Sequence, residues 1–233
     1  MPRGNTAKIN ANIAAIKLAK RLIETGKKAT PEQMNVLRRY TGWGGLSSVF
    51  QANDKNYKAL QDLLTEEEYD SARASTTTAF YTPSEVTASV WDMIEKLGFR
   101  GGNILEPSAG IGNFFALMPE SISNVSQLRG VELDTVSGSI LKLLYPDANI
   151  NISGFEKQRI ANNSIDLVVS NVPFGNFKVY DSNNKDISTQ FDIHDYFIAK
   201  SIRTLKSGGI GVFITTSSTL DKGSALRNWV INT

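Results

Sequence analysis

From residue 76 onward, short apolar segments alternate with segments of helical character, and this alternation constrains the fold more than any other feature of the chain. The expected strands lie near 103–106, 128–132, 148–152, 165–170 and 210–216. The expected helices lie near 112–118, 135–144, 193–206 and 224–232. Strands that alternate with helices form parallel sheets, because each helix returns the chain to the same end of the sheet. The sequence therefore predicts an α/β domain with a mainly parallel sheet over residues 76–233.

Two further segments of this domain have recognisable local patterns. The segment Thr82–Glu85 has the spacing of a helix capping box. The helix that follows is expected to bury one face, formed by Val86, Val90, Ile94 and Leu97. The polar stretch 175–190 comes after the fourth expected strand and is predicted to be a long loop. Loops of that length within a domain are usually functional or disordered.

The first 75 residues differ from this domain in pattern and charge. Isoleucines recur at helical spacing between Ile9 and Thr25, and Thr30–Gln33 is a capping box whose helix is expected to run to Gly42. Residues 1–40 hold nine Lys or Arg against two Glu, an excess of +7, whereas the whole chain has a formal charge of +2. A basic helical region suits contact with phosphates, although a solvated helix face explains the charge equally well. We therefore predict a separate helical region over residues 1–75.

Composition argues against several classes of protein. The chain is 41% apolar but has no run approaching the roughly 20 apolar residues needed to cross a bilayer. The absence of cysteine removes disulfides and cysteine nucleophiles, and a single histidine argues against a zinc site. No N-terminal signal segment is visible. We therefore expect a cytoplasmic protein that requires neither a membrane nor a metal.

A glycine turn follows the first expected strand. Gly110 and Gly112 let the backbone approach a ligand closely, and the next helix is expected to offer unpaired amides. The dinucleotide fingerprint Gly-x-Gly-x-x-Gly is incomplete, because Phe115 occupies its third glycine position. Glu106, at the strand end, would repel a pyrophosphate but attract the ammonium of an amino-acid-bearing cofactor. The turn favours S-adenosylmethionine over NAD, with a purely structural turn as the alternative.

A second carboxylate, Glu132, ends the next expected strand. A carboxylate at this position is placed to accept hydrogen bonds from ribose hydroxyls. Asp134 follows it and is better explained as the N-cap of the next helix. Glu132 is therefore the predicted ribose ligand, although an isolated acidic residue at a strand end is more often just solvated.

The fourth expected strand ends in Asn171-Val172-Pro173-Phe174. The Asn171 side-chain oxygen and the Val172 carbonyl are two acceptors that suit the hydrogens of an exocyclic amino group. Pro173 stiffens the turn, and Phe174 offers a ring on which an extruded base can stack. A structural turn with a core phenylalanine is the alternative, but the position at the end of a parallel strand favours a binding role.

Taken together, these residues resemble the N6-adenine DNA methyltransferases whose cofactor motifs precede the catalytic motif, the gamma order. Asn171–Phe174 resembles their Asn-Pro-Pro-Tyr/Phe catalytic motif, and Phe80–Pro83 resembles the motif that lies over the methionine moiety. Phe197 matches an aromatic residue beside the cofactor adenine, and its helical spacing fits a core role comparably well. The likeness spans residues 76–233 and implies a Rossmann-like S-adenosylmethionine-dependent methyltransferase fold with a helical appendage. The implied cofactor-binding residues are Phe80, Tyr81, Thr82, Glu106, Pro107, Ser108, Gly110, Gly112, Phe114, Glu132, Glu156 and Phe197.

The chain departs from that family at three points. Val172 replaces the usual first proline, and Glu156 stands near the place of an aspartate that bonds the cofactor adenine. The chain also stops at Thr233, before later strands of the fold, so we expect a fragment. The segment Trp43-Gly44-Gly45 resembles the N-terminal part of large methylase-helicase proteins of bacterial mobile elements and phages. That likeness implies a C-terminal helicase or target-recognition region in the longer protein.

The leading functional hypothesis is transfer of a methyl group from S-adenosylmethionine to the N6 amino group of a flipped adenine in DNA, as in restriction-modification systems. Methylation of a protein glutamine or an RNA base uses the same catalytic logic and remains an alternative. A module that binds the cofactor or DNA without turnover is a third possibility, and a dehydrogenase is a distant fourth because of Phe115.

Overall fold

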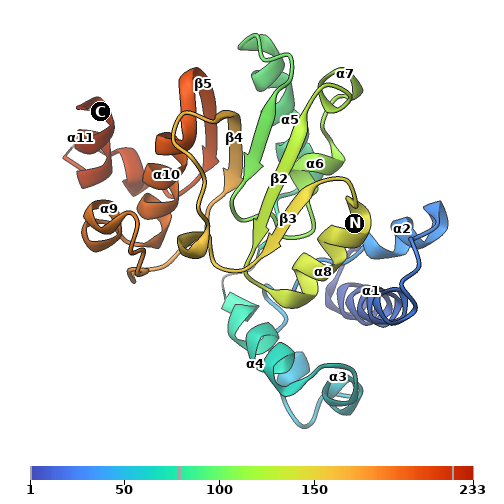
Figure 1. Ribbon diagram of the computed structural model, residues 1–233. Coiled ribbons are helices and arrows are strands. Elements are labelled where there is room, and N and C mark those ends of the chain that lie inside the picture. The colour runs from blue at the N-terminus through green and yellow to red at the C-terminus, as the bar shows by residue number, and fades with distance from the viewer. Residues whose placement is uncertain (1, 78–79, 222, 233) are drawn as a thin grey trace.

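The computed structural model describes residues 2–77, 80–221 and 223–232, and its centre is a five-stranded parallel sheet (Figure 1). The strand order is β3-β2-β1-β4-β5. The chain therefore builds outward from β1 in one direction and then reverses at β4, which creates a crevice at the carboxyl ends of β1 and β4. The predicted Rossmann-like fold is confirmed. The strands are β1 Asn103–Glu106, β2 Gln127–Glu132, β3 Asn149–Ile152, β4 Ile165–Asn171 and β5 Leu205–Ile214.

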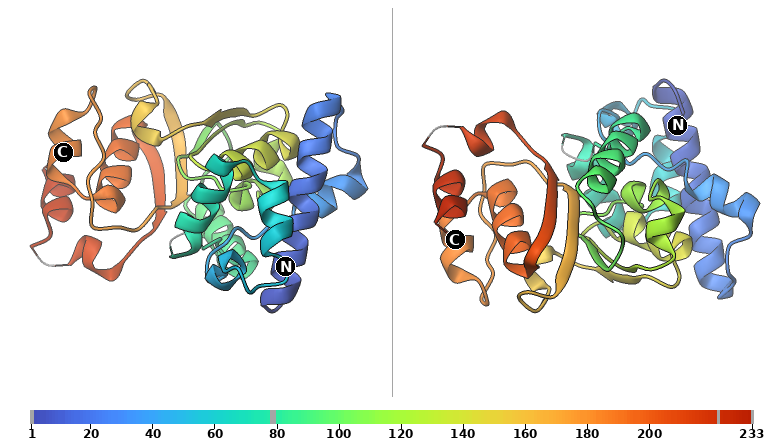
Figure 2. Two further views of the ribbon diagram at one scale, coloured as in Figure 1. Left: turned by 90° about the horizontal axis from the view of Figure 1, so that it is seen from below. Right: turned by 90° about the horizontal axis from the view of Figure 1, so that it is seen from above.

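Helices surround the sheet, as the two turned views in Figure 2 show. The helices that precede the sheet are α1 Asn5–Thr25, α2 Pro31–Leu37, α3 Tyr57–Leu63, α4 Glu66–Ala74 and α5 Ser84–Lys96. The helices within and after it are α6 Asn113–Ala116, α7 Glu120–Ser123, α8 Thr135–Leu144, α9 Lys185–Gln190, α10 Ile193–Thr204 and α11 Ala225–Ile231. None of the helices in the described part of the chain is long and apolar enough to span a bilayer.

Alternating strand residues face two separate cores. Ile104 and Leu167 pack with the buried residues of α5 and with Phe115, whereas the neighbouring Leu105 and Val168 pack with the buried residues of α10. Successive side chains of a strand point to opposite faces, so a sheet buried on both sides needs such continuous apolar runs. The sequence pattern of β1 and β4 meets that requirement.

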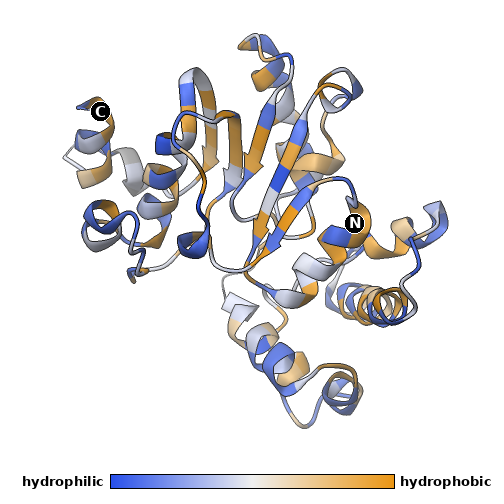
Figure 3. Cartoon of the chain, viewed as in Figure 1, coloured by the Kyte–Doolittle hydropathy of each residue, from blue (hydrophilic) through white to orange (hydrophobic). Residues whose placement is uncertain are grey.

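Helices α1 and α2 pack against α8 rather than standing apart. Ile16 and Leu37 belong to one buried cluster with Ile140 and Leu144 of α8. Figure 3 shows hydrophobic and hydrophilic residues mixed in α1, and the residues that the helix buries recur at helical spacing, as an amphipathic helix requires. Asn12 of α1 is fully buried, and its amide donates to the Gly42 carbonyl over 2.6 Å and accepts from the Thr41 amide over 2.8 Å. The division at residue 75 remains a prediction.

Several local expectations were wrong. The Thr30 capping box forms, but α2 ends at Leu37 because the chain turns into the buried Tyr40–Trp43 segment. Thr82 makes no cap, since Pro83 precedes α5 and the Thr82 side chain is buried. The buried face of α5 is Thr87, Val90, Trp91 and Ile94, and Val86 and Leu97 are exposed.

Three element boundaries also differ from expectation. The helix after the glycine turn is only Asn113–Ala116, too short to offer a full set of helix amides. The predicted loop 175–190 contains α9. Strand β5 begins at Leu205, because Leu205 pairs with Ile165 of β4 and the pairing resumes after an irregularity around Gly208. The sequence pattern indicated that this glycine segment was a boundary before the strand.

Candidate functional site

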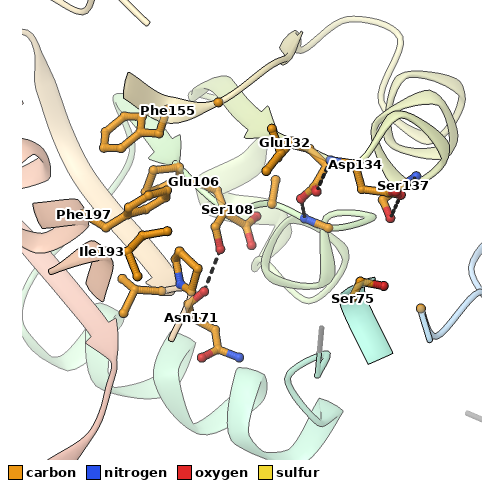
Figure 4. Close-up of a pocket in the computed structure, with 18 of the residues that line it drawn as sticks. Ser75, Glu106, Ser108, Glu132, Asp134, Ser137, Phe155, Asn171, Ile193 and Phe197 are labelled. Atoms are coloured by element: carbon orange, nitrogen blue, oxygen red, sulfur yellow. Dashed lines mark hydrogen bonds between the residues drawn. The ribbon is translucent and has the colours of Figure 1, made fainter. Parts of the chain in front are cut away.

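A large cavity lies at the carboxyl ends of β1, β2 and β4, where Figure 4 shows Glu106, Ser108, Glu132 and Asn171 around a common space. Its volume is about 680 Å³. Pockets of this size hold ligands of cofactor dimensions, and in open α/β sheets they form where the strand order reverses. The position and size of the cavity therefore identify it as the candidate site.

Two carboxyl groups give the cavity its electrostatic character. The Glu106 side chain, at the end of β1, is only 2% exposed, and its Oε2 atom has no hydrogen-bond partner. Burial, together with the nearby charge of Glu132, raises the pKa of Glu106 well above its usual range. A buried acceptor without a partner is costly, so this atom is suited to a ligand that donates a hydrogen bond or carries a positive charge.

Glu132, at the end of β2, is fixed by two backbone amides. The Gly110 amide donates to its Oε2 atom over 2.6 Å, and the Asp134 amide donates to its Oε1 atom over 2.8 Å. Burial raises the pKa of Glu132 to about 7, against the opposing effect of these amides. Each carboxylate oxygen retains acceptor capacity after one such bond, so the group can still receive ligand hydroxyls. Asp134 caps α8 through the Ser137 amide, as predicted.

The glycine turn is shaped by the ring of Tyr81. Gly110 adopts a left-handed backbone conformation with φ of 56°, and a Cβ atom there would collide with the Tyr81 ring. The Tyr81 hydroxyl lies 2.9 Å from the Ser137 hydroxyl, and the Asn113 side chain donates to the Thr82 carbonyl over 3.2 Å. The segment Phe80–Thr82 is thereby held over the turn. Glycine is required at position 110 for this close approach.

The Asn171 turn meets the glycine turn directly. The Ser108 hydroxyl donates to the Asn171 carbonyl over 2.7 Å. The Asn171 side-chain amide donates from Nδ2 to the Phe80 carbonyl over 3.3 Å, and its Oδ1 atom is buried without a partner. The bond to Phe80 orients the amide, so the unpartnered acceptor is the oxygen. Val172 is buried, and its amide donates to the Ile214 carbonyl of β5 over 3.2 Å.

Aromatic side chains form another part of the cavity wall. The rings of Phe155 and Phe197 lie 5.0 Å apart between centroids, and both residues are almost fully buried. Phe155 belongs to a 3₁₀ turn, Phe155–Lys157, that places Glu156 at the cavity. Phe197 is thus both a core residue and a lining residue, which explains why its sequence pattern fitted either role.

Fifteen of the sixteen predicted site residues line this one cavity. They are Phe80, Tyr81, Thr82, Glu106, Pro107, Ser108, Gly110, Phe114, Glu132, Glu156, Asn171, Val172, Pro173, Phe174 and Phe197. Gly112 does not line it. With φ of 83° at the start of α6, Gly112 packs against Tyr145 and Leu141, and its carbonyl accepts from the Tyr145 hydroxyl. These contacts explain the glycine by packing, and the binding roles of Gly112 and of the other residues remain predictions.

Sequence reasoning missed several lining residues, Phe155 and Ser137 among them, and two groups from other parts of the chain. One comes from the N-terminal helical region and consists of Tyr40, Gly42, Trp43, Ser71, Ala74 and Ser75. The other follows the Asn171 turn and includes Phe177, Val179 and Tyr180. The Trp43-Gly44-Gly45 motif marked the N-terminal region as distinctive. No spacing in the sequence, however, indicates that this region packs beside Tyr81. Among the described residues, no cluster of three or more His, Cys, Asp or Glu is placed to hold a metal ion.

The arrangement combines three chemical features in one enclosed space. It offers carboxyl acceptors for a cation and for hydroxyls, an amide oxygen oriented by the backbone, and aromatic surfaces for planar rings. Ser108 follows the Glu106 strand end and donates to the Asn171 carbonyl, so it connects the carboxyl groups to the Asn171 turn. A ligand at the carboxyl groups and one at Asn171 would therefore lie side by side. Such a site suits group transfer between two bound molecules.

Comparisons with known proteins agree with this geometry. The family model of the Eco57I restriction-modification methylase matches residues 120–233. The chain is 30% identical over 219 residues, 93% of its length, to the Defense against restriction protein B of Escherichia phage P1. It is 28% identical over 142 residues, 60% of its length, to the Modification methylase CviBIII of Paramecium bursaria Chlorella virus NC1A.

Solved structures agree on the fold. A protein from Listeria monocytogenes assigned as a class I S-adenosylmethionine-dependent methyltransferase superposes with a TM-score of 0.52 at 13% identity, over 95% of this chain and 77% of that one. The curated relatives are longer proteins. The chain spans 8% of the phage protein and 37% of the viral methylase.

Proposed function

We propose that this chain is the catalytic part of a restriction-modification methylase and transfers a methyl group from S-adenosylmethionine to the N6 amino group of adenine in DNA. The observation that carries the proposal is the Asn171 oxygen, buried and without a partner in the same cavity as the Glu106 carboxyl. These two orphaned acceptors match an amino group and an ammonium group, one from each reactant.

The residues of the cavity fit S-adenosylmethionine. Its ammonium suits Glu106, whose Oε2 atom lacks a partner, and its ribose hydroxyls suit Glu132. Phe155 and Phe197 offer ring surfaces to its adenine, with Glu156 beside them. When bound, this cofactor supplies an electrophilic methyl group. Among the described residues, no Lys, Arg or His lines the cavity to pair with a polyphosphate, which argues against a nucleotide triphosphate or NAD.

Asn171 and Val172 prepare the amino group for attack. The lone pair of an exocyclic amino nitrogen is delocalised into the base, so the nitrogen is a poor nucleophile. Acceptors aimed at its hydrogens, the Asn171 Oδ1 atom and the Val172 carbonyl, favour a tetrahedral nitrogen with a localised lone pair. The Phe80 carbonyl keeps the Asn171 amide from rotating, because rotation would bring two oxygens together. On transfer, the amino nitrogen would gain the methyl group as the carbon–sulfur bond of the sulfonium breaks with its electron pair left on sulfur, and the nitrogen would then lose one proton to solvent.

Recognition of a DNA sequence is assigned to the remainder of the intact protein. This chain spans only 8% of its phage relative, so a target-recognition or helicase region has ample room outside it. The target adenine must leave the base stack to reach a cavity of this depth, with Phe174 as its stacking surface. Because the substrate is DNA, we place the activity in the bacterial cytoplasm.

The test is transfer of tritiated methyl from S-adenosylmethionine to DNA, RNA and peptide acceptors, followed by nucleoside analysis. N6-methyladenine is expected in DNA, and Asn171→Ala should reduce its formation by at least about 100-fold with cofactor affinity kept. Asn35→Ala, on the exposed surface of α2, is the matched control and should be fully active. Label confined to RNA or peptide, or full activity of Asn171→Ala, would refute the proposal.

A further inference from the structure

Three aromatic side chains at the mouth of the cavity are unusually exposed. Phe80 is 58% exposed, Phe177 is 54% exposed and Tyr180 is 72% exposed, yet all three line the cavity that contains Asn171. By contrast, Phe155 and Phe197 are buried in its wall. Large aromatic rings left in water beside a binding cavity commonly mark a surface that a ligand covers. We call Phe177 and Tyr180 the aromatic rim.

The segment that carries the aromatic rim is fixed in place at its first ring. The Ile193 amide, at the start of α10, donates to the Phe177 carbonyl over 2.8 Å. The Phe177 ring packs over Gly175, where a Cβ atom would approach it within 2.5 Å. The position of this ring is therefore set by contacts on both its backbone and its face, although more than half of the side chain remains in solvent.

A buried ion pair fixes the segment at its second ring. Asp181, directly after Tyr180, has no exposed surface, and its carboxylate accepts from Lys200 over 2.8 Å and from the Tyr196 hydroxyl over 2.6 Å. Its other oxygen accepts the Asn183 amide over 2.9 Å. Although burial alone would raise it, these bonds lower the pKa of Asp181 to about 2. The carboxylate is ionised and bonded, so Tyr180 is displayed on a rigid turn.

The same lysine also reaches the opposite wall of the cavity. Its ammonium donates to the Phe155 carbonyl over 2.7 Å and to the Gln158 carbonyl over 3.1 Å. All three donors of Lys200 are therefore engaged, and they join the segment 177–181 to the turn that holds Phe155 and Glu156. A rigid rim loses little conformational freedom on binding, which is what a stacking surface requires.

We propose that Phe177 and Tyr180 form a stacking surface for an unpaired base of the DNA substrate, in addition to Phe174. The proposal rests on the proposed function, because it assumes that a base approaches Asn171 from outside. A flat base with two apolar faces matches aromatic rings that are fixed and solvent-facing. The cofactor is a weaker candidate for these rings, because its adenine has the buried pair Phe155 and Phe197 available deeper in the cavity.

The experiment measures binding of DNA that carries the fluorescent base 2-aminopurine at the methylation target, using the intact protein. Phe177→Ala and Tyr180→Ala should each weaken DNA binding by about tenfold and change the fluorescence of the bound probe. Tyr180→Phe should behave as the parent, because the ring is kept. Leu97→Ala, at the C-cap of α5, is the control for loss of surface apolar area, because Leu97 is 60% exposed and does not line the cavity. Cofactor affinity should be unchanged in all four variants.

The outcomes separate the rim from the methyl-transfer reaction. If neither alanine variant alters DNA binding or probe fluorescence, the aromatic rim is not a base surface. If cofactor affinity falls instead, the rings cover the cofactor adenine and the proposal is wrong. If both variants weaken DNA binding but the parent protein transfers no methyl group to DNA, the stacking role of the aromatic rim is supported and the proposed methyl-transfer activity is refuted. Because both rings are solvent-exposed, the variants should unfold at the same temperature as the parent.

Discussion

Binding of the cofactor should release protons, because burial raises the pKa of both carboxyl groups of the cavity and a cationic ligand opposes that shift. The pKa of Glu132 is raised to about 7, and that of Glu106 is raised well above its usual range by burial and by Glu132. Both shifts lie above the value of the free side chain, so each group loses its proton as the pH rises through the shifted pKa. An ammonium ligand favours the ionised carboxylates and displaces these protons.

The magnitude follows from the ionised fraction of Glu132. Between pH 6 and pH 7, that fraction rises about fivefold for a pKa of about 7, and the raised pKa of Glu106 acts in the same direction. Affinity for S-adenosylmethionine should therefore increase by more than about fivefold over that interval. At pH 7, Glu132 should release about half a proton on binding, and Glu106 should add to that release.

Glu106→Gln isolates the contribution of Glu132. This variant keeps the shape of the side chain but has no proton to release, so the increase in affinity between pH 6 and pH 7 should fall to about fivefold and the proton release to about 0.5. Isothermal titration calorimetry in phosphate and in Tris measures the proton count directly. Glu120→Gln, on the surface of α7, is the control and should match the parent. An equal proton count in the parent and Glu106→Gln would falsify the reasoning.

Three further variants test the packing around the site. Lys200→Met should lower the free energy of unfolding by about 3–5 kcal/mol in urea titrations, because it leaves the Asp181 carboxylate buried without its cation, and adding Asp181→Asn should recover part of that loss. Asn12→Ala should cost about 1–3 kcal/mol, seen as a lower melting temperature, because it strands the buried Thr41 amide and Gly42 carbonyl. Gly112→Ala should cost at least about 1 kcal/mol in the same measurement while cofactor affinity is kept, and a loss of affinity without destabilisation would contradict its packing role.

The parallel sheet was predictable because its signal is local. Strands β1 and β4 are short apolar runs bounded by polar or glycine residues, and α8 has both an acidic N-cap and a helical apolar period. Expectation failed where tertiary packing overrides local pattern. Thr82 has the sequence of a cap, yet the glycine turn and Asn113 recruit its backbone and bury its side chain. Gly208 has the sequence of a boundary, yet β5 tolerates it as an irregularity at the sheet edge.

The candidate site was predictable to the extent that its residues follow strands. Glu106, Glu132 and Asn171 each end a parallel strand, and the carboxyl ends of parallel strands meet at one edge of the sheet. No comparable sequence pattern marks the position of the aromatic rim. Phe177 and Tyr180 lie in a polar stretch without strand or helix period, and their placement depends on contacts to α10 that span up to 19 residues of sequence.

The dependence of Asn171 on distant residues can be followed from the N-terminus. Asn12 holds Gly42, the Gly45 amide donates to the Thr76 carbonyl over 2.8 Å, and the ring of Tyr40 packs beside that of Tyr81. These contacts seat the segment Phe80–Thr82, whose first carbonyl orients the Asn171 amide. The N-terminal helices therefore do more than cover α8. A rotation of the Asn171 amide would place its donor where the substrate amino group needs an acceptor, so the orientation that makes the catalytic hypothesis chemically possible is maintained from outside the parallel sheet.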